Sequence, residues 1–331
     1  MATRVISEKG IFELLKLLKK RYEVFAPQKY KSEVVFAPFD KTSKLLLNYK
    51  TTILPPKQFF LPPQEVLFAV KRGGAQEPKA QRSFIIFGLN LKDLAGICQL
   101  DEIMEKEPAD SFYLKRRKRA ILIAISEREV GIPPGGDLIL EKIGNLYRAI
   151  TPSQIGRRIT NLPVFKEAVL NKKPEPKTKP TKLEMMLLDS ELLAKAVEWS
   201  RKNYPQIWEK LEKICLGCGI CTYVCPLCYC FEMEDQTSLD QSVCTRCRFW
   251  SACTLPGFAT VAGGHNFRPT LKERYFNWYY HKFVRAYKEF GQAQCVACGR
   301  CQKYCPAGID IEKVLVEIVT EFQKAHPKRD F

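Results

Sequence analysis

The sequence lacks an apolar run of about 18 residues, the length at which a transmembrane helix becomes expected. Its first residues also lack the apolar segment of a secretory signal. No glycine-rich nucleotide-binding loop follows an expected strand, and no nucleophile–base pair or nickel site is visible, so the chain offers no site for a flavin, a nicotinamide or nickel. We therefore expect a cytoplasmic protein that does not enter a membrane and is not an enzyme on its own.

Cysteine is nearly absent from the first two thirds of the 331 residues. Only Cys98 precedes Cys215, and the other 13 of the 14 cysteines follow. A cytoplasmic location disfavours a disulfide framework, and cysteines crowded at short fixed spacings in such a chain indicate bound metal. Cys98 itself lies in an apolar helical stretch, where we expect a buried structural thiol.

The N-terminal part has the pattern of a small α/β domain, predicted over residues 1–170. Apolar residues recur at helical spacing over Gly10–Tyr22 and Leu91–Glu105. Apolar runs at Phe84–Gly88 and Ala120–Ile125 flank the second helix and indicate buried strands, hence a βαβ unit. Further short runs typical of strands are Val34–Phe36, Lys44–Tyr49 and Val66–Val70.

A linker rich in lysine and proline is predicted over residues 171–182. Beyond it, a mainly helical domain is predicted over residues 183–331, with helical periodicity over Leu183–Ile214, Lys272–Phe290 and Ile311–Phe322. The fold class is thus α+β, with almost all cysteines in the second domain.

Within that domain the pattern C-x2-C-x2-C-x3-C-P occurs twice. In two-cluster ferredoxins, three cysteines of such a run bind one [4Fe–4S] cluster and the fourth binds the other cluster. A zinc site would more often show two separated C-x2-C pairs. We therefore predict two [4Fe–4S] clusters, the first held by Cys215, Cys218, Cys221 and Cys305 and the second held by Cys295, Cys298, Cys301 and Cys225.

The glycines inside the two runs have a predicted role as well. We expect Gly217, Gly219 and Gly299 to let backbone amides approach the sulfur atoms, since glycine tolerates backbone angles that other residues avoid.

The two runs are far apart, because 70 positions separate Cys225 from Cys295. We expect a helical dicluster domain with an insertion, and five further cysteines lie in that insertion. Five soft ligands suit a third cluster with one thiol to spare, while a zinc site and unligated thiols remain alternatives. These cysteines are Cys228, Cys230, Cys244, Cys247 and Cys253.

Four segments carry a family resemblance: Thr52–Phe60 (TILPPKQFF), Phe84–Gly88 (FIIFG), Cys225–Cys230 (CPLCYC) and Ala262–Thr270 (AGGHNFRPT). Together they resemble the iron–sulfur β subunit of soluble, sulfhydrogenase-type [NiFe] hydrogenases, a family that also includes one of the subunits of anaerobic sulfite reductase. In that family the positions matching Cys228, Cys230 and Cys253 are typically cysteine, which implies that they hold the third cluster. We place Cys247 as its fourth ligand and keep Cys244 as the alternative.

The resemblance implies an electron-transfer subunit that passes single electrons through its clusters. Its implied partners are the hydrogenase large and small subunits and a flavin subunit that uses NAD(P), within a hetero-oligomer. The first alternative is the same relay in an anaerobic sulfite reductase or another multi-subunit oxidoreductase.

The remote alternative is an iron–sulfur protein that binds nucleic acid, suggested by the net charge of +17 and the basic run Lys115–Arg119. No recognition motif accompanies that run, so we expect a solvated face or a dock for an acidic partner. A structural cluster would also need only four cysteines. We therefore expect no nucleic-acid partner.

Relatives often carry a His-Ala-Cys-Asp motif and further cysteines in the N-terminal domain. This chain has Asn90–Asp93 and Ser126–Glu129 at those places, so no cluster is expected there. His265 is expected to form hydrogen bonds in a turn or to tune a nearby cluster, and Arg268 to stabilise a reduced cluster or form a structural ion pair. His281 and His326 are given no role.

Overall fold

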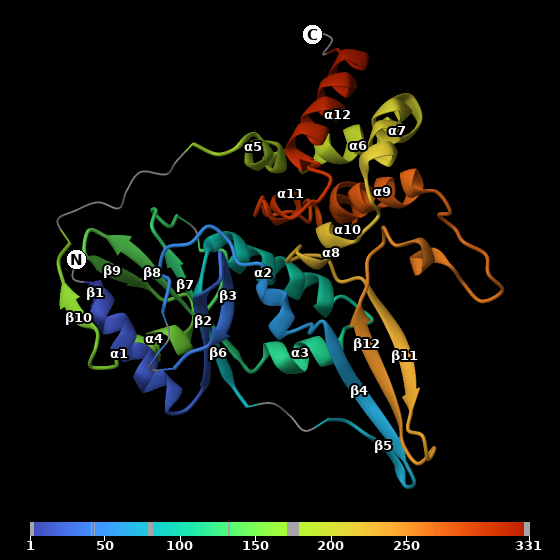
Figure 1. Cartoon of the computed structure of the whole chain (residues 1–331). Helices are drawn as coiled ribbons and strands as arrows, with labels where there is room; N and C mark the ends of the chain where they lie inside the picture. Colours follow the sequence, from blue (N-terminus) through green and yellow to red (C-terminus); the bar gives the residue numbers. More distant parts are fainter. Residues whose placement is uncertain are drawn as a thin grey trace. The chain divides into compact units, whose positions relative to one another are not determined.

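The computed structural model describes residues 3–40, 42, 44–78, 82–131, 133–170 and 179–327. The chain divides into two units, the first made of residues 1–61 and 79–179 and the second of residues 62–78 and 180–331. Figure 1 shows helices and strands in both units, which confirms the predicted α+β class. Most of the predicted linker, residues 171–178, lies outside the described residues.

An eight-stranded sheet forms the centre of the first unit, in the order β10-β1-β9-β8-β7-β6-β2-β3. The strands β2, β6, β7 and β8 pair in parallel, and the pairings outside this group are antiparallel. The strands are β1 (Thr3–Ser7), β2 (Glu23–Tyr30), β3 (Glu33–Pro38), β6 (Phe84–Leu89), β7 (Ala120–Ser126), β8 (Leu138–Ile143), β9 (Leu146–Ile150) and β10 (Lys166–Ala168).

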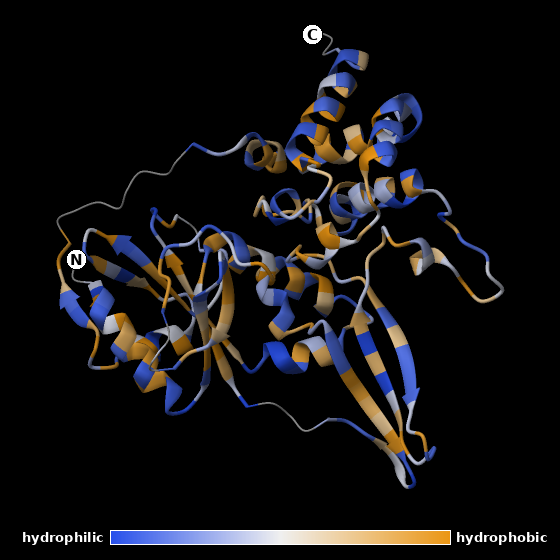
Figure 2. Cartoon of the chain, in the orientation of Figure 1, coloured by the Kyte–Doolittle hydropathy of each residue, from blue (hydrophilic) through white to orange (hydrophobic). Residues whose placement is uncertain are grey.

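The middle of this sheet is a continuous apolar core. Every residue of β6 and β7 is buried, as a parallel strand covered on both faces requires, and Figure 2 shows both strands coloured as largely hydrophobic. The predicted helix between them is α2, with the predicted bounds, so the βαβ unit is confirmed. The helices of the unit are α1 (Glu8–Lys19), α2 (Leu91–Glu105), α3 (Ser111–Arg117), α4 (Gln154–Thr160) and the 3-10 turn η1 (Pro56–Phe59).

The segments Asn90–Asp93 and Ser126–Glu129, where no cluster is expected, have structural roles in this unit. The Asn90 side chain caps α2 by accepting a hydrogen bond from the Asp93 amide at 2.8 Å. The Ser126 hydroxyl donates to the Arg128 carbonyl at 2.7 Å and closes the turn after β7. These residues therefore shape the backbone, as N-caps and turn residues commonly do.

Two predicted strands differ from the structure. The segment Lys44–Tyr49 was wrongly predicted as a strand, because its one described pairing is an isolated bridge between Leu45 and Gln28. The side chains of Leu45 and Leu47 are partly buried and pack against the apolar core, which explains the apolar pattern of this segment. Val66–Val70 is a strand, β4 (Gln64–Lys71), but it belongs to the second unit and so interrupts the N-terminal domain drawn over residues 1–170.

The second unit contains a four-stranded antiparallel sheet in the order β11-β12-β4-β5. A buried ion pair between Glu65 and Arg248 joins β4 to β12, although the two residues are 183 positions apart. Such a pair disfavours separation of the strands, since a single charge left behind would be buried without its partner. The strands are β4, β5 (Gly74–Gln76), β11 (Phe231–Thr237) and β12 (Cys244–Trp250).

Helices make up the remainder of the second unit and share one core that includes Trp208, Tyr279 and Leu315. The predicted helical regions are present, although Leu183–Ile214 is divided into three helices and Lys272–Phe290 contains a π-helical stretch, η3. The elements are α5 (Lys182–Leu188), α6 (Ser190–Asn203), α7 (Pro205–Ile214), α8 (Ile220–Tyr223), η2 (Pro256–Ala259), α9 (Leu271–Tyr279), η3 (Tyr280–Arg285), α10 (Ala286–Phe290), α11 (Arg300–Lys303) and α12 (Ile311–Ala325).

None of the helices described is both long and apolar enough to cross a membrane.

Candidate metal centres

The two cysteine runs have the same backbone conformation. Gly219 and Gly299 occupy equivalent positions, have φ angles of 77° and precede the one-turn helices α8 and α11. Two residues after the first cysteine of each run, Gly217 and Ala297 have φ angles of 62° and 49°. The sequence repeat is therefore also a structural repeat, and at Ala297 a non-glycine residue adopts the left-handed conformation that the loop requires.

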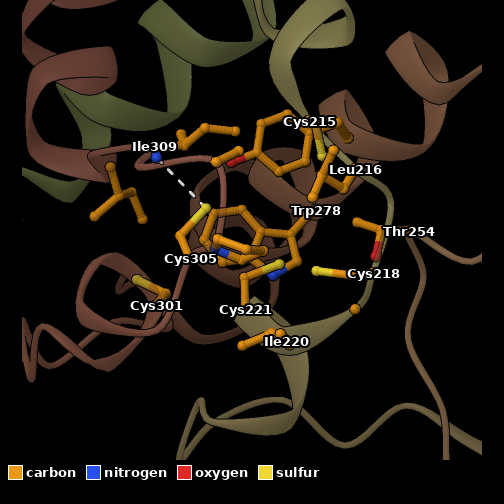
Figure 3. A pocket seen from close by; sticks show the side chains of 15 residues that line it. Cys215, Leu216, Cys218, Ile220, Cys221, Thr254, Trp278, Cys301, Cys305 and Ile309 are labelled. Carbon is orange, nitrogen blue, oxygen red and sulfur yellow. Dashed lines mark hydrogen bonds between the residues drawn. The ribbon is translucent and has the colours of Figure 1, made fainter.

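The first cavity is lined by five cysteines from both runs, among them Cys215, Cys218 and Cys221 of the first run and Cys305 of the second. Figure 3 shows their side chains around one space, with Trp278 and Thr254 beside them. The structure thus brings together all four residues predicted for the first cluster. Cys301, predicted for the second cluster, also borders this cavity.

Hydrogen-bond donors around this cavity suit sulfur acceptors. The Gly217 amide donates a hydrogen bond to the Cys215 sulfur, and the Ile309 amide donates one to the Cys305 sulfur, each at 3.4 Å. Figure 3 shows the bond between Ile309 and Cys305 as a dashed line. The buried Nε1 of Trp278 and hydroxyl of Thr254 have no hydrogen-bond partner among the described residues. Buried donors normally find an acceptor, so these two groups fit a cavity whose sulfur-rich occupant supplies one.

The cysteines predicted for the second cluster also lie close to one another. Burial, followed by the nearby thiols of Cys295, Cys225 and Cys298, raises the pKa of Cys301 well above its ordinary value. Cys225 belongs to the first run and the other three to the second, so the crossed arrangement predicted from the spacing is also present here.

A buried lysine that the sequence did not suggest lies beside this second group. The Lys282 ammonium donates to the Cys225 sulfur at 3.0 Å and to the Gln294 carbonyl at 3.3 Å, and its residue is only 4% exposed. Burial lowers its pKa, but the neighbouring sulfur groups of Cys225, Cys228 and Cys295 raise it by more, so the net direction is well above the ordinary value. Lys282 therefore stays positively charged beside these cysteines.

The second cavity, about 290 Å³ in volume, is lined by three cysteines of the insertion, Cys228, Cys230 and Cys253. The Ser251 amide donates to the Cys230 carbonyl at 3.0 Å and so joins the two ends of the β11–β12 hairpin. Hydrogen bonding to Cys230 and burial raise the pKa of Cys253 well above its ordinary value. The three residues predicted for a third cluster are thus neighbours, and the cavity between them is roomy.

The remaining two cysteines of the insertion lie on β12, away from this cavity. Cys247 pairs with Glu234 across the hairpin, and its thiol contacts the Gln236 side-chain oxygen at 3.7 Å. Cys244 lies at the far end of the strand, opposite Thr237. Neither predicted candidate for the fourth ligand lines the cavity with the other three.

The buried thiols are protonated in the metal-free chain at neutral pH. Burial raises the pKa of Cys221 to about 12 and that of Cys295 to about 11. Thiolates are the form that binds iron, so loading the sites releases these protons.

Among the described residues, no three His, Cys, Asp or Glu side chains converge as the ligands of a single ion would. A four-iron cluster is larger than an ion and spreads its four thiolates more widely.

One wall of the second cavity consists of Trp278, His281, Lys282 and Arg285 from α9 and η3. Burial, followed by the charges of Arg285 and Arg268, lowers the pKa of His281 to about 4, so its ring is neutral at pH 7. The four residues follow the i, i+3, i+4, i+7 spacing of one helical face, a pattern that the sequence contains but that does not show what this face meets.

The structure also shows the surroundings of His265, Arg268, the basic run and Cys98, which were assigned minor roles from the sequence. His265 is exposed in a turn whose carbonyl accepts from the Val261 amide, and its ring contacts Phe267, so it is a turn residue that lines neither cavity. The Arg268 amide donates to the Asn266 side-chain oxygen at 2.9 Å, and its carbonyl accepts from the Arg274 guanidinium at 3.3 Å. In the basic run, Arg117 forms an ion pair with Asp101 at 2.9 Å. Cys98 is half-buried on α2, and burial raises its pKa to about 11.

Comparison with known proteins agrees with this geometry. Residues 214–309 match the family model of a 4Fe-4S dicluster domain. Over 322 residues the chain is 32% identical to sulfhydrogenase 2 subunit beta of Pyrococcus furiosus, an alignment that covers 92% of this chain and 95% of that relative. No solved structure matches the chain.

Proposed function

The chain belongs to the family of iron–sulfur β subunits of sulfhydrogenases, and we propose that it relays single electrons between a [NiFe] hydrogenase module and a flavin subunit that uses NAD(P). The proposed partners are the hydrogenase large and small subunits and that flavin subunit, in a cytoplasmic hetero-oligomer. A bound [4Fe–4S] cluster supplies the redox chemistry, since it takes up and gives up one electron.

The observation that carries this proposal is the crossed pair of cysteine runs. We assign the first cluster to Cys215, Cys218, Cys221 and Cys305, the second to Cys295, Cys298, Cys301 and Cys225, and a third to the cavity of Cys228, Cys230 and Cys253. A cluster with a purely structural role needs one such set. Three neighbouring sets suit the passage of electrons, and the two cavities share Trp278 as a common wall.

The chain's own residues set the conditions for that passage. The amides of Gly217 and Ile309 donate to ligand sulfurs and favour the more negative, reduced cluster. The Lys282 ammonium acts in the same direction beside Cys225. Buried aromatic residues such as Trp278 and Tyr279 limit the access of water, which would otherwise screen these interactions.

Anaerobic affinity purification of the chain from its native cells tests the proposed partners. We expect stoichiometric co-elution of hydrogen-dependent viologen reduction, together with a flavin-containing subunit. An eluate that carries a sirohaem absorption band and lacks hydrogenase activity would assign the relay to a sulfite reductase and contradict the hydrogenase assignment.

A further inference from the structure

The second cavity supplies three thiols for a cluster that needs four ligands. Cys228, Cys230 and Cys253 line it, while Cys244 and Cys247 do not. We propose that His281, which lines the same cavity, is the fourth ligand of the third cluster. This inference rests on the third cluster of the proposed function and goes beyond it by replacing a predicted cysteine with an imidazole.

The position of His281 favours this role. The residue lies in the π-helical stretch η3, on the same helical face as Trp278, Lys282 and Arg285, and all four side chains line the cavity. A π-helical turn is rare and is often found where a helix must direct a side chain into a functional site. The helix that leads to it begins at a capping box between Thr270 and Glu273, which fixes the start of this wall.

The chemistry of the side chain fits as well. The His281 ring is half-buried and forms no hydrogen bond to any described residue, so both nitrogen atoms lack a protein partner in the part of the chain that the structure describes. Imidazole is an established ligand of iron–sulfur clusters in place of cysteine. One ring nitrogen can therefore bind iron while the other is left for a hydrogen bond.

The alternative ligand, Cys247, is held in place by its strand. β12 pairs with β11 on one side and with β4 on the other, where the register shifts between Arg246 and Cys247 but Cys247 still pairs with Val66. Cys247 pairs with Glu234, four residues beyond Cys230, which corresponds to about 13 Å along a strand. Bringing its thiol to the cavity would require these ladder hydrogen bonds to break.

The proposal has a consequence for charge. An oxidised cluster with four thiolates carries a charge of about −2, and one with three thiolates and a neutral imidazole about −1. Lys282 and Arg285 line the same cavity, while the Arg285 guanidinium also forms an ion pair with Glu289 at 2.6 Å. A less negative cluster accepts an electron more readily, so we expect the third cluster to have the highest potential of the three.

Iron and acid-labile sulfide determination on matched variants of the full chain tests the assignment. The wild-type chain is expected to hold about 12 irons, from three four-iron clusters. His281→Ala is expected to lose one to four irons, and Cys247→Ala to lose none, as is the control Cys98→Ala in the first unit. Iron loss in Cys247→Ala with full retention in His281→Ala would overturn the proposal.

A spectroscopic measurement identifies the ligand directly. With ¹⁵N-histidine in the chain, pulsed EPR of the reduced cluster of highest potential is expected to show a strong nitrogen coupling. His281→Cys is expected to keep about 12 irons, to lose this coupling and to shift that cluster to lower potential. No nitrogen coupling in a wild-type chain with about 12 irons would contradict His281 alone. About eight irons in the wild type would remove the third cluster, and the proposal with it, while a two-cluster relay would stand.

Discussion

The two units of the molecule reach a stable interior in different ways. The first unit buries whole strands of apolar residues, such as β6 and β7, against one another. The centre of the second unit brings together cysteine thiols, a buried lysine, and indole and hydroxyl donors that have no acceptor in the part of the chain that the structure describes. Its interior calls for a component that the chain does not encode.

This difference explains why the same residue type behaves differently in the two units. Cys98 lies on α2 as a half-buried thiol, and the other 13 cysteines belong to the second unit. In the second unit, thiols such as Cys221 and Cys295 are buried beside others and hold protons that iron can replace. The neighbours of a cysteine, more than its burial, therefore indicate whether it serves as a ligand.

The largest expected effect comes from removing iron. Anaerobic chelation is expected to unfold the cluster region while the eight-stranded sheet persists, because structural metal sites contribute roughly 10 kcal/mol and the cysteines assigned to the clusters all lie in the second unit. Hydrogen exchange read by mass spectrometry checks this. Protection of β6 and β7 should be unchanged, while that of α8, α11 and β12 should be lost. Equal loss of protection in both units would contradict the comparison.

The next effect isolates the charge of Lys282. Lys282→Met removes the ammonium that donates to the Cys225 sulfur at 3.0 Å. Two unit charges about 5 Å apart interact by about 3 kcal/mol at an effective dielectric constant near 20. The substitution is expected to lower the reduction potential of the second cluster, to which Cys225 is assigned, by on the order of 100 mV. A change of 100 mV corresponds to about 2.3 kcal/mol per electron.

Potentiometric EPR titration measures this shift. Lys288→Met is the matched control, because Lys288 is exposed and pairs with Glu198 on the surface. Equal shifts in the two variants would mean that burial next to Cys225 is irrelevant to the potential.

A third effect separates backbone strain from crowding within the repeated runs. Gly219 and Gly299 share a φ angle of 77°, so alanine at either is expected to cost about 1–2 kcal/mol. A Cβ at Gly219 would lie 2.7 Å from the Cβ of Ala252, whereas one at Gly299 has nothing within 4 Å. Gly219→Ala is therefore expected to lower the unfolding temperature and the iron content more than Gly299→Ala. The reverse order would refute the account of this loop.

The smallest effect concerns pH in the first unit. Burial, followed by Asp101, raises the pKa of Cys98 from 9.0 to about 11. Between these values the folded chain keeps a proton that the unfolded chain has lost, so the free energy of unfolding falls as the pH rises. Because the thiol is partly exposed, we expect a loss of about 1–2 kcal/mol, absent in Cys98→Ala.

This loss is measured as the difference in the free energy of unfolding of the metal-loaded protein between pH 8.5 and pH 11, with unfolding monitored by hydrogen exchange in β7. Other titrating groups contribute to both proteins and cancel in the difference. An identical pH dependence in the two proteins would show that the Cys98 thiol is not held protonated by its surroundings.

The sequence was sufficient to predict those parts of the structure that depend on residues close together in the chain or on a repeated motif. The apolar runs and the helical periodicity around Leu91–Glu105 predicted the βαβ unit with its helix bounds, because local propensity and burial agree there. The repeated cysteine run also predicted that Cys305 lies beside Cys215, Cys218 and Cys221, a pairing that the first cavity contains.

It was insufficient where partners come from distant parts of the chain. All seven residues of β11 are exposed and mostly polar, so no apolar pattern marks this strand, which exists because β12 pairs with it. The run Val66–Val70 indicated a strand but could not reveal a partner more than 170 positions away. Lys282 and His281 were missed for the same reason, since only the fold shows that this helical face meets the cysteines.

The most direct test of the central claim is a potentiometric titration of the isolated chain followed by EPR. The account predicts reversible one-electron signals that integrate to about three spins per chain, together with about 12 irons and matching sulfide. Iron that stays EPR-silent across the accessible potentials, or a chain that is fully folded without iron, would contradict the claim that the second unit is completed by electron-carrying clusters.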